Sequence, residues 1–312
     1  MKKNESTIQI DKLKLCFLAP IIELKYLQDK PSVLFLGDYK LKPVIDDRFD
    51  YCYDVYQANT TGELLFDIDE IEDWCNWGLD AKEPEIPIAQ IKFSNNIDRN
   101  KDYVYLILKI YNHVLYSDIL AEVVRLPFLL GNGIKFNNFS ELHIALDTQQ
   151  NIPSLIKKML RDKSITTLIN RKVIEERDEI IQGVFFEYST TLNRLKYPSI
   201  TLKQKKAHKD KGAEIQAYNK LAEIRNQSGK FYILKHYGNP KKLYRLEVRL
   251  PYQPIKDYHV KKGIEEDMNL IFDKEKLLEM FLFYLNSVVS FRDRSRKKIP
   301  WKTLLKMSSQ GI

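Results

Sequence analysis

The sequence predicts an α+β fold with a central, mostly antiparallel sheet, flanking helices and a basic helical segment at the C-terminal end. Several short runs alternate apolar and polar residues, which is typical of strands that bury one face. These runs do not alternate regularly with helices, as the βαβ units of a parallel sheet would. A longer apolar run over residues 273–291 has the periodicity of a helix.

The predicted elements are spread along the whole chain. Strands are expected over residues 12–22, 51–56, 103–111, 141–147, 183–189, 214–220 and 243–250. Helices are expected over 115–126, 151–160 and 273–291, and Asn151 and Asp273 are suited to cap the last two. We expect a core of residues 1–250, divided into parts 1–137 and 138–250, followed by the basic segment 251–312.

Positive charge is concentrated in two clusters of this chain, whose formal net charge is +8. The clusters cover residues 194–211 and 292–306, and a single Asp opposes each of them. Clustered Lys and Arg side chains displace counterions from phosphates, so the sequence predicts DNA binding. The predicted DNA contacts are Lys203, Lys205, Lys206, Lys209, Lys211, Arg245, Arg249, Arg294, Arg296, Lys297 and Lys298.

Cysteine use and the N-terminus favour a cytoplasmic protein. Cys16, Cys52 and Cys75 are widely spaced and form no CxxC pair, which excludes a zinc module or a disulfide framework. The polar N-terminal residues lack the apolar stretch of a secretory signal, and no apolar run is long enough for a membrane helix. The common nucleotide-binding, zinc-protease and hydrolase motifs are absent from the sequence.

Two of the predicted strands carry charged residues on one face. In residues 141–147, Glu141, His143 and Asp147 share a face, and in residues 244–250 Arg245, Glu247 and Arg249 share one. If the two strands are neighbours, His143, Asp147 and Glu247 come together and can hold Mg²⁺ or Mn²⁺. The alternative is an ordinary sheet with one solvated face, in which the two arginines balance Glu247.

A tyrosine at a strand end is a candidate nucleophile. Tyr188 lies at the end of the predicted strand 183–189, and a phenol can attack a phosphodiester to leave a covalent phosphotyrosine. The chain has 18 tyrosines, and most tyrosines pack in the interior or cover the surface. Tyr197 and Tyr218 therefore remain alternative nucleophiles.

The order of these motifs resembles that of a known family. The segments are IDKLKLCF, IALDT, FFEYSTT, IQAYNKLAEI and YRLEVRL, and they run in this order from residue 10 to residue 250. They resemble the rolling-circle replication initiators of the Rep-trans type, found on plasmids and related mobile elements. Filamentous-phage replication proteins have a similar arrangement.

The resemblance implies a metal-dependent enzyme that nicks and rejoins DNA. It implies that Asp147 and Glu247 are metal-site carboxylates, that Lys220 is a catalytic or phosphate contact, and that Tyr188 is the nucleophile. His143 stands where the family commonly has an Asp, so it is either a metal ligand or the sign of a degenerate site.

We therefore expect an initiator of rolling-circle replication that nicks one strand at an origin with Mg²⁺ or Mn²⁺. Its expected partners are origin DNA and the single-stranded nick site, with a host helicase and a second copy of the chain as further candidates. One alternative is a non-catalytic, sequence-specific DNA-binding regulator of replication. Another is the relaxase of a conjugative element, which uses the same chemistry.

Overall fold

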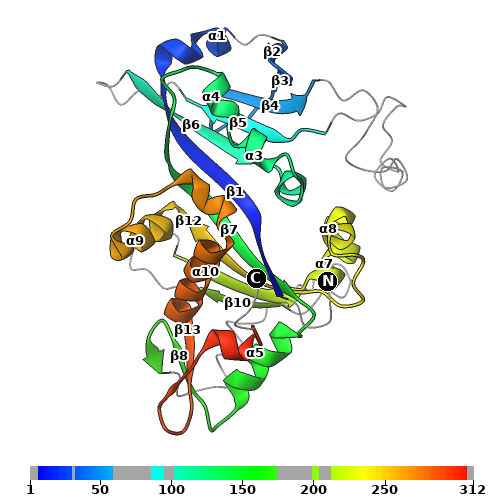
Figure 1. Ribbon diagram of the computed structural model, residues 1–312, viewed down its shortest axis with the longest axis vertical. Helices are drawn as coiled ribbons and strands as arrows, with labels where there is room; N and C mark the ends of the chain where they lie inside the picture. Colours follow the sequence, from blue (N-terminus) through cyan, green and yellow to red (C-terminus); the bar gives the residue numbers. More distant parts are fainter. Residues whose placement is uncertain are drawn as a thin grey trace. The chain divides into compact units, whose positions relative to one another are not determined.

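The chain folds into two compact units, which Figure 1 shows as a ribbon. The structure is a computed structural model that describes residues 6–29, 32–58, 86–94, 102–173, 199–203 and 212–307. The predicted strand 183–189 lies outside this range. The first unit comprises Met1–Asp11, Glu141–Lys230 and Leu234–Ile312, and the second comprises Lys12–Ser140 and Phe231–Ile233.

Two long strands, β1 (Ser6–Pro20) and β7 (Lys135–Thr148), have residues in both units. In the first unit the sheet order is β10-β11-β12-β7-β1, and a smaller sheet has the order β14-β13-β8-β9. Helix α8 (Phe231–His236) also has residues in both units. The other elements of the first unit are α5 Ile152–Arg161, β8 Thr166–Ile169, β9 Lys172–Val173, β10 Ser199–Lys203, β11 Glu214–Asn219, α7 Lys220–Glu223, η3 Ile224–Ser228, β12 Tyr244–Pro251, α9 Tyr252–Lys262, η4 Met268–Phe272, α10 Lys274–Val288, β13 Val289–Arg292, β14 Lys298–Ile299 and α11 Trp301–Leu304.

The sheet of the first unit has one apolar face. Leu142, Ile144 and Leu146 of β7 are completely buried, and so are Leu246 and Val248 of the neighbouring strand β12. Helices α5, α9 and α10 pack against β11 and β12. Because successive side chains of a strand point to opposite faces, the charged residues of these strands lie on the other face.

The α+β fold class is confirmed, and two of the predicted helices begin where their caps are. Asn151 accepts a hydrogen bond from the amide of Ser154 at 3.1 Å at the start of α5. Asp273 accepts one from the amide of Lys276 at 3.0 Å at the start of α10. Each cap satisfies an amide that has no partner within its helix.

The basic C-terminal segment contains a hairpin as well as helices. Strand β13 continues directly from α10, and it pairs antiparallel with β14 through Phe291 opposite Ile299 and Arg292 opposite Lys298. In the turn, the carboxylate of Asp293 accepts a hydrogen bond from the amide of Lys297 at 2.9 Å. The helix predicted to reach residue 291 therefore ends at Val288, and the basic residues that follow lie mainly on a β-hairpin.

In the second unit the sheet order is β7-β1-β6-β5-β4-β3-β2. The prediction of a single helix over residues 115–126 is wrong, because the backbone of Ser117 is extended. The hydroxyl of Ser117 donates a hydrogen bond to the carbonyl of Val114. The elements of this unit, apart from β1, β7 and α8, are η1 Ile21–Leu24, α1 Lys25–Gln28, β2 Leu34–Leu36, β3 Tyr39–Pro43, β4 Tyr51–Gln57, β5 Ala89–Phe93, β6 Tyr103–Ile110, η2 Asn112–Tyr116, α3 Leu120–Val123 and α4 Leu126–Leu129.

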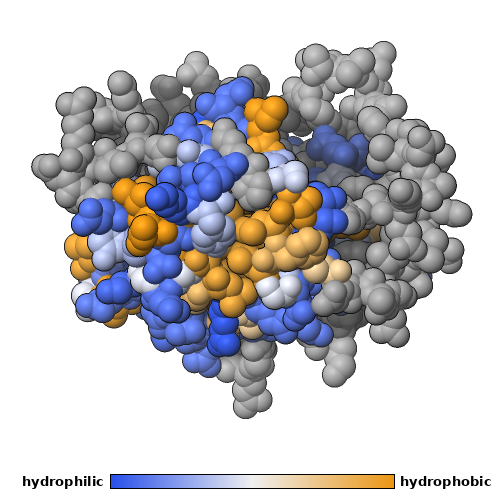
Figure 2. Space-filling model, turned by 90° about the horizontal axis from the view of Figure 1, so that it is seen from above, coloured by the Kyte–Doolittle hydropathy of each residue, from blue (hydrophilic) through white to orange (hydrophobic). Residues whose placement is uncertain are grey.

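The surface of the second unit includes several exposed apolar side chains. Figure 2 shows apolar side chains gathered on the face that is seen from above. Ile22 of η1 and Phe35 of β2 have exposed fractions of 73% and 62%, and Leu129 of α4 has 54%. Among the helices that the structure describes, none has the length and apolar character needed to cross a membrane.

Trp301 fixes the basic hairpin to the body of the first unit. Its indole is only 2% exposed, donates a hydrogen bond to the carbonyl of Val289 at 3.0 Å, and contacts the ring of Phe291 edge-on. We expect Trp301→Ala to lower the free energy of unfolding by about 3–5 kcal/mol, the usual cost of emptying a large core site. Urea unfolding measures this value. If Trp301→Ala lost less free energy of unfolding than Trp301→Phe, the result would contradict this expectation.

Candidate functional site

The charged face of the first unit's sheet is formed by three adjacent strands. Strand β12 pairs antiparallel with β7 on one side and with β11 on the other. Residues directly opposite each other in such pairs lie on the same face. This polar face carries His143 and Asp147 of β7, Arg245, Glu247 and Arg249 of β12, and Glu214, Gln216 and Tyr218 of β11.

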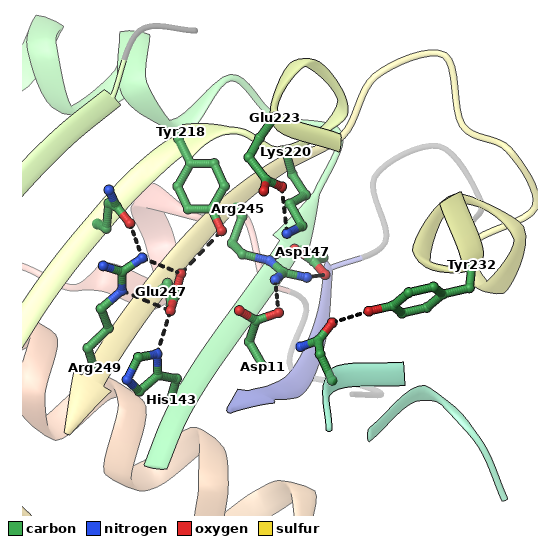
Figure 3. Close-up of polar contacts among 12 residues, drawn as sticks. Asp11, His143, Asp147, Tyr218, Lys220, Glu223, Tyr232, Arg245, Glu247 and Arg249 are labelled. Atoms are coloured by element: carbon green, nitrogen blue, oxygen red, sulfur yellow. Dashed lines mark hydrogen bonds and ion pairs between the residues drawn. The ribbon is translucent and has the colours of Figure 1, made fainter. Parts of the chain in front are cut away.

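A completely buried ion pair lies at one end of the polar face. Arg245 stands opposite Asp147, and both side chains have an exposed fraction of 0%. The guanidinium donates to both carboxylate oxygens, at 2.7 and 2.6 Å, and also to Asp11 of β1. The hydroxyl of Tyr237 donates to Asp147 at 2.9 Å. Figure 3 shows Arg245 between the two aspartates.

Glu247 is the centre of a second network on the same face, and it is 1% exposed. It accepts hydrogen bonds from the guanidinium of Arg249 at 2.9 Å and from the hydroxyl of Tyr218 at 3.2 Å. One of its oxygens lies 2.8 Å from Nδ1 of His143 (Figure 3). Burial opposes the charge on Glu247, but His143 and Arg249 outweigh it and hold its pKa below the ordinary value.

His143 bridges two carboxylates at the more exposed end of the face. Its Nε2 lies 3.0 Å from Glu141, in addition to the contact between its Nδ1 and Glu247. Burial of the ring disfavours the imidazolium, but hydrogen bonds and charge from Glu141 and Glu247 prevail and raise the pKa of His143 above its usual range. The two carboxylates therefore extend the pH range over which His143 is protonated.

Lys220, predicted as a catalytic or phosphate contact, is buried with 2% exposure at the start of α7. Its ammonium lies 2.8 Å from Glu223 and over the ring of Tyr218. Burial, and then the charge of Arg245, lower its pKa below the ordinary value. In this arrangement Lys220 contributes to the buried charge network and has almost no surface for a phosphate.

The structure bears on one of the three candidate nucleophiles. The phenol of Tyr218 is 4% exposed and donates its proton to Glu247. Burial and the charge of Glu247 raise the pKa of Tyr218 well above its usual range. A nucleophile needs the opposite, an accessible oxygen that loses its proton readily, so Tyr218 is unsuited to the role. Tyr188 and Tyr197 lie outside the described residues.

The predicted metal ligands do not form one site. Asp147 and Glu247 are on adjacent strands and on the same face, as expected, but Asp147 stands opposite Arg245 and both its oxygens accept bonds from that guanidinium. His143 contacts Glu247 and Glu141. Within the described part of the chain, no group of three or more His, Cys, Asp or Glu side chains is arranged to hold a metal ion. The trio therefore does not fit Mg²⁺ or Mn²⁺.

The predicted DNA contacts differ in their exposure. Arg294, Arg296, Lys297 and Lys298 are exposed on the β13–β14 hairpin, and Arg249 is 34% exposed. Arg245 is completely buried, so a direct DNA contact by its side chain is excluded in this conformation. The backbone of Lys203 lies at the end of β10, opposite Glu214. The remaining predicted contacts, Lys205, Lys206, Lys209 and Lys211, lie outside the described residues.

Sequence reasoning missed several members of the polar networks. Asp11 and Tyr237 complete the environment of Arg245 and Asp147, and Glu141 completes that of His143. Alternation had placed Glu141 on the same face as His143, but Glu141 was not counted among the site residues. Asp11 and Tyr237 had none, because they reach the site from β1 and from the chain after α8.

We expect the Arg245–Asp147 pair to be necessary for folding. Asp147→Leu or Arg245→Met should each lower the free energy of unfolding by about 3–5 kcal/mol, because one buried charge loses its partner. The double variant Arg245→Met/Asp147→Leu should lose less than the sum of the single losses. Urea unfolding of the three variants tests this. Additive losses would show that the pair is not coupled in solution.

The stability of the first unit should depend on the protonation of His143. Because folding raises its pKa, the stabilising contribution of the imidazolium is fully present below the unfolded-state value of about 6.5. It is lost as the pH rises through the raised pKa of the folded state. Urea unfolding over this range should show the decline in the wild type and not in His143→Gln. A decline of equal size in both proteins would assign it to another group.

Comparisons with known proteins give a likeness to solved structures and none to a family model or a curated protein. No family model matches the chain, and no curated protein does. Among solved structures, the chain is similar to the rolling-circle replication initiator protein from Geobacillus stearothermophilus. The identity is 12%, the TM-score is 0.48, and the match covers 97% of this chain and 96% of that one. The likeness concerns the general course of the backbone.

Proposed function

We propose that this protein initiates DNA replication by binding an origin and nicking one strand through a tyrosine. One observation carries the proposal: the strands of the IALDT, IQAYNKLAEI and YRLEVRL motifs are direct neighbours and direct their charged side chains to the same face. Sequence separation alone does not require this, since about a hundred residues lie between β7 and β12.

The β13–β14 hairpin is the DNA-binding element that we propose in the first unit. Its turn exposes cations, and Asp293 holds the turn in shape. Arg296 has a φ of +61°, in the left-handed region, where an L-residue costs roughly 1–2 kcal/mol and glycine costs little. A cation at such a position in an exposed turn supports a role for the side chain in binding phosphates.

The proposed reaction is a transesterification at phosphorus. The phenol oxygen of Tyr188 forms a bond to the phosphorus, the bond from phosphorus to the 3′ oxygen breaks, and the strand keeps a free 3′-hydroxyl. The phenol must lose a proton and the leaving oxygen must gain one. His143 and the half-buried Arg249 are the groups of the polar face that we propose to meet the phosphate, since both lie at its more exposed end.

A divalent cation remains a prediction from the family resemblance. The predicted ligands His143, Asp147 and Glu247 do not form one metal site, so the steps of the reaction are assigned to protein groups. A bound Mg²⁺ or Mn²⁺ would polarise the phosphoryl oxygen and offset the charge that develops on it.

A non-catalytic DNA-binding regulator is the second candidate. The observation that favours it is the pairing of Asp147 with Arg245, which neutralises a carboxylate that the enzyme is expected to use. Such a protein would bind DNA with a steep dependence on salt and without dependence on a divalent cation.

Covalent capture of DNA distinguishes the two candidates. Incubation of the full chain with a labelled single strand carrying the origin and with Mn²⁺ should give an adduct stable in denaturing gels. Tyr188→Phe should abolish the adduct and keep DNA binding, whereas Tyr197→Phe should form it as the wild type does. If the adduct were lost only in Tyr197→Phe, the nucleophile would be Tyr197 and not Tyr188. Binding of the wild type without any adduct would contradict the nicking activity.

A further inference from the structure

The sheet of the second unit has a cationic face that the proposed nicking chemistry does not use. On one side of β1, β6, β5, β4 and β3, alternate residues such as Leu15, Leu108, Ile91 and Val55 are completely buried. The residues between them form the other face, which we call the lysine face. Its cations are Lys12, Lys14, Lys40, Lys42, Lys92 and Lys109.

The register aligns these side chains across five strands. Lys14 stands opposite Lys109, which stands opposite Gln90. Gln90 in turn stands opposite Asp54, and Asp54 stands opposite Lys42. One carboxylate therefore shares this row with three lysines. It accepts hydrogen bonds from the amide of Gln90 at 2.8 Å and from Tyr111 at 3.1 Å.

Like charges that face each other across strands destabilise a sheet. Lys14 and Lys109 form such a pair. Burial, and then the charges of Lys92 and Lys14, lower the pKa of Lys109 below its ordinary value. Asp46 lies 2.5 Å from Lys92 and offsets its charge. The facing positions of Lys14 and Lys109 therefore carry a cost in stability, which a bound polyanion would offset.

Exposed aromatic rings extend the lysine face along β6. Tyr103 and Tyr105 lie on the same side of this strand as Lys109, and their exposed fractions are 45% and 55%. The rings of Tyr56 and Tyr111 lie under the ammonium groups of Lys42 and Lys109, with 4.9 and 4.7 Å between nitrogen and ring centre. The face thus combines cations with flat apolar surfaces on a rigid sheet.

We propose that the lysine face binds single-stranded DNA, with phosphates on the lysines and bases stacked on Tyr103 and Tyr105. Single strands suit this surface because their bases are free to stack on aromatic rings, whereas those of a duplex are already stacked. The choice of DNA over RNA rests on the proposed function; recognition of a single strand rests on the charges and rings described above.

Binding of oligothymidylate to the full chain tests the two kinds of contact separately. Tyr103→Ala/Tyr105→Ala should weaken the binding of a labelled strand of about 12 nucleotides by roughly fivefold or more, and Tyr103→Phe/Tyr105→Phe should preserve it. Fluorescence anisotropy without a divalent cation gives the dissociation constant. These conditions do not allow nicking, so the result is independent of any catalytic activity.

Removal of two lysines should change the salt dependence. In Lys14→Gln/Lys109→Gln, the slope of log affinity against log salt should fall by roughly 1.4, because each phosphate contact contributes about 0.7 on single strands. The exposed Lys256 of the first unit supplies the control, and Lys256→Gln should leave the slope unchanged. Circular dichroism shows whether each variant is folded.

Three outcomes would overturn the inference. In the first, the folded tyrosine and lysine variants bind oligothymidylate as the wild type does. In the second, the lysine variants lose binding to phosphatidylserine vesicles and keep binding to the oligonucleotide, which makes the face a membrane surface. In the third, oligouridylate binds more tightly than oligothymidylate and depends on the same residues, which makes RNA the ligand.

Discussion

The first unit depends on the ion pair between Arg245 and Asp147. Both groups are withdrawn completely from water, at a desolvation cost that only close geometry and further hydrogen bonds can offset. The bidentate contact, Asp11 and Tyr237 provide those bonds. The pair also joins β12 to β7 in one register. A shift of β12 by one residue would place Arg245 on the apolar face beneath α5, α9 and α10 and would leave Asp147 on the polar face without its partner.

The same pair divides the polar face into two regions with different chemistry. At one end, Asp147 is neutralised and shielded, and its role is structural. At the other end, Glu247 is linked to His143 and Arg249, which reach toward solvent. The charged groups of the shielded end organise the sheet, while those of the other end include the two groups that we propose to meet the phosphate. A strand pair with acidic residues is thus not by itself a metal site.

Alternation in the sequence predicted which side chains share a face, and it did so correctly for β7 and β12. It did not predict which residues stand opposite each other, because alternation repeats every two residues while the register is set by contacts between strands. The expected partnership of Asp147 with Glu247 therefore became a partnership with Arg245. The helices with an Asn or Asp cap were found because capping is local. The prediction of one helix over residues 115–126 failed, because the backbone of Ser117 is extended and separates two short helical segments.

Positive charge on a soluble protein often reflects nothing more than a solvated surface. In this protein two groups of cations occupy positions that lower the stability of the fold. Arg296 has a backbone conformation that suits glycine, and Lys14 faces Lys109 across two strands. The need for a solvated surface does not explain either arrangement, since a cation is solvated equally well at a position without backbone strain or at one that does not face another cation. A polyanionic ligand gives both a physical reason, and the hairpin and the lysine face each present cations in a different setting. The turn of a hairpin can enter a groove of DNA or contact its phosphate backbone, whereas a sheet with exposed tyrosines suits the stacking of unpaired bases.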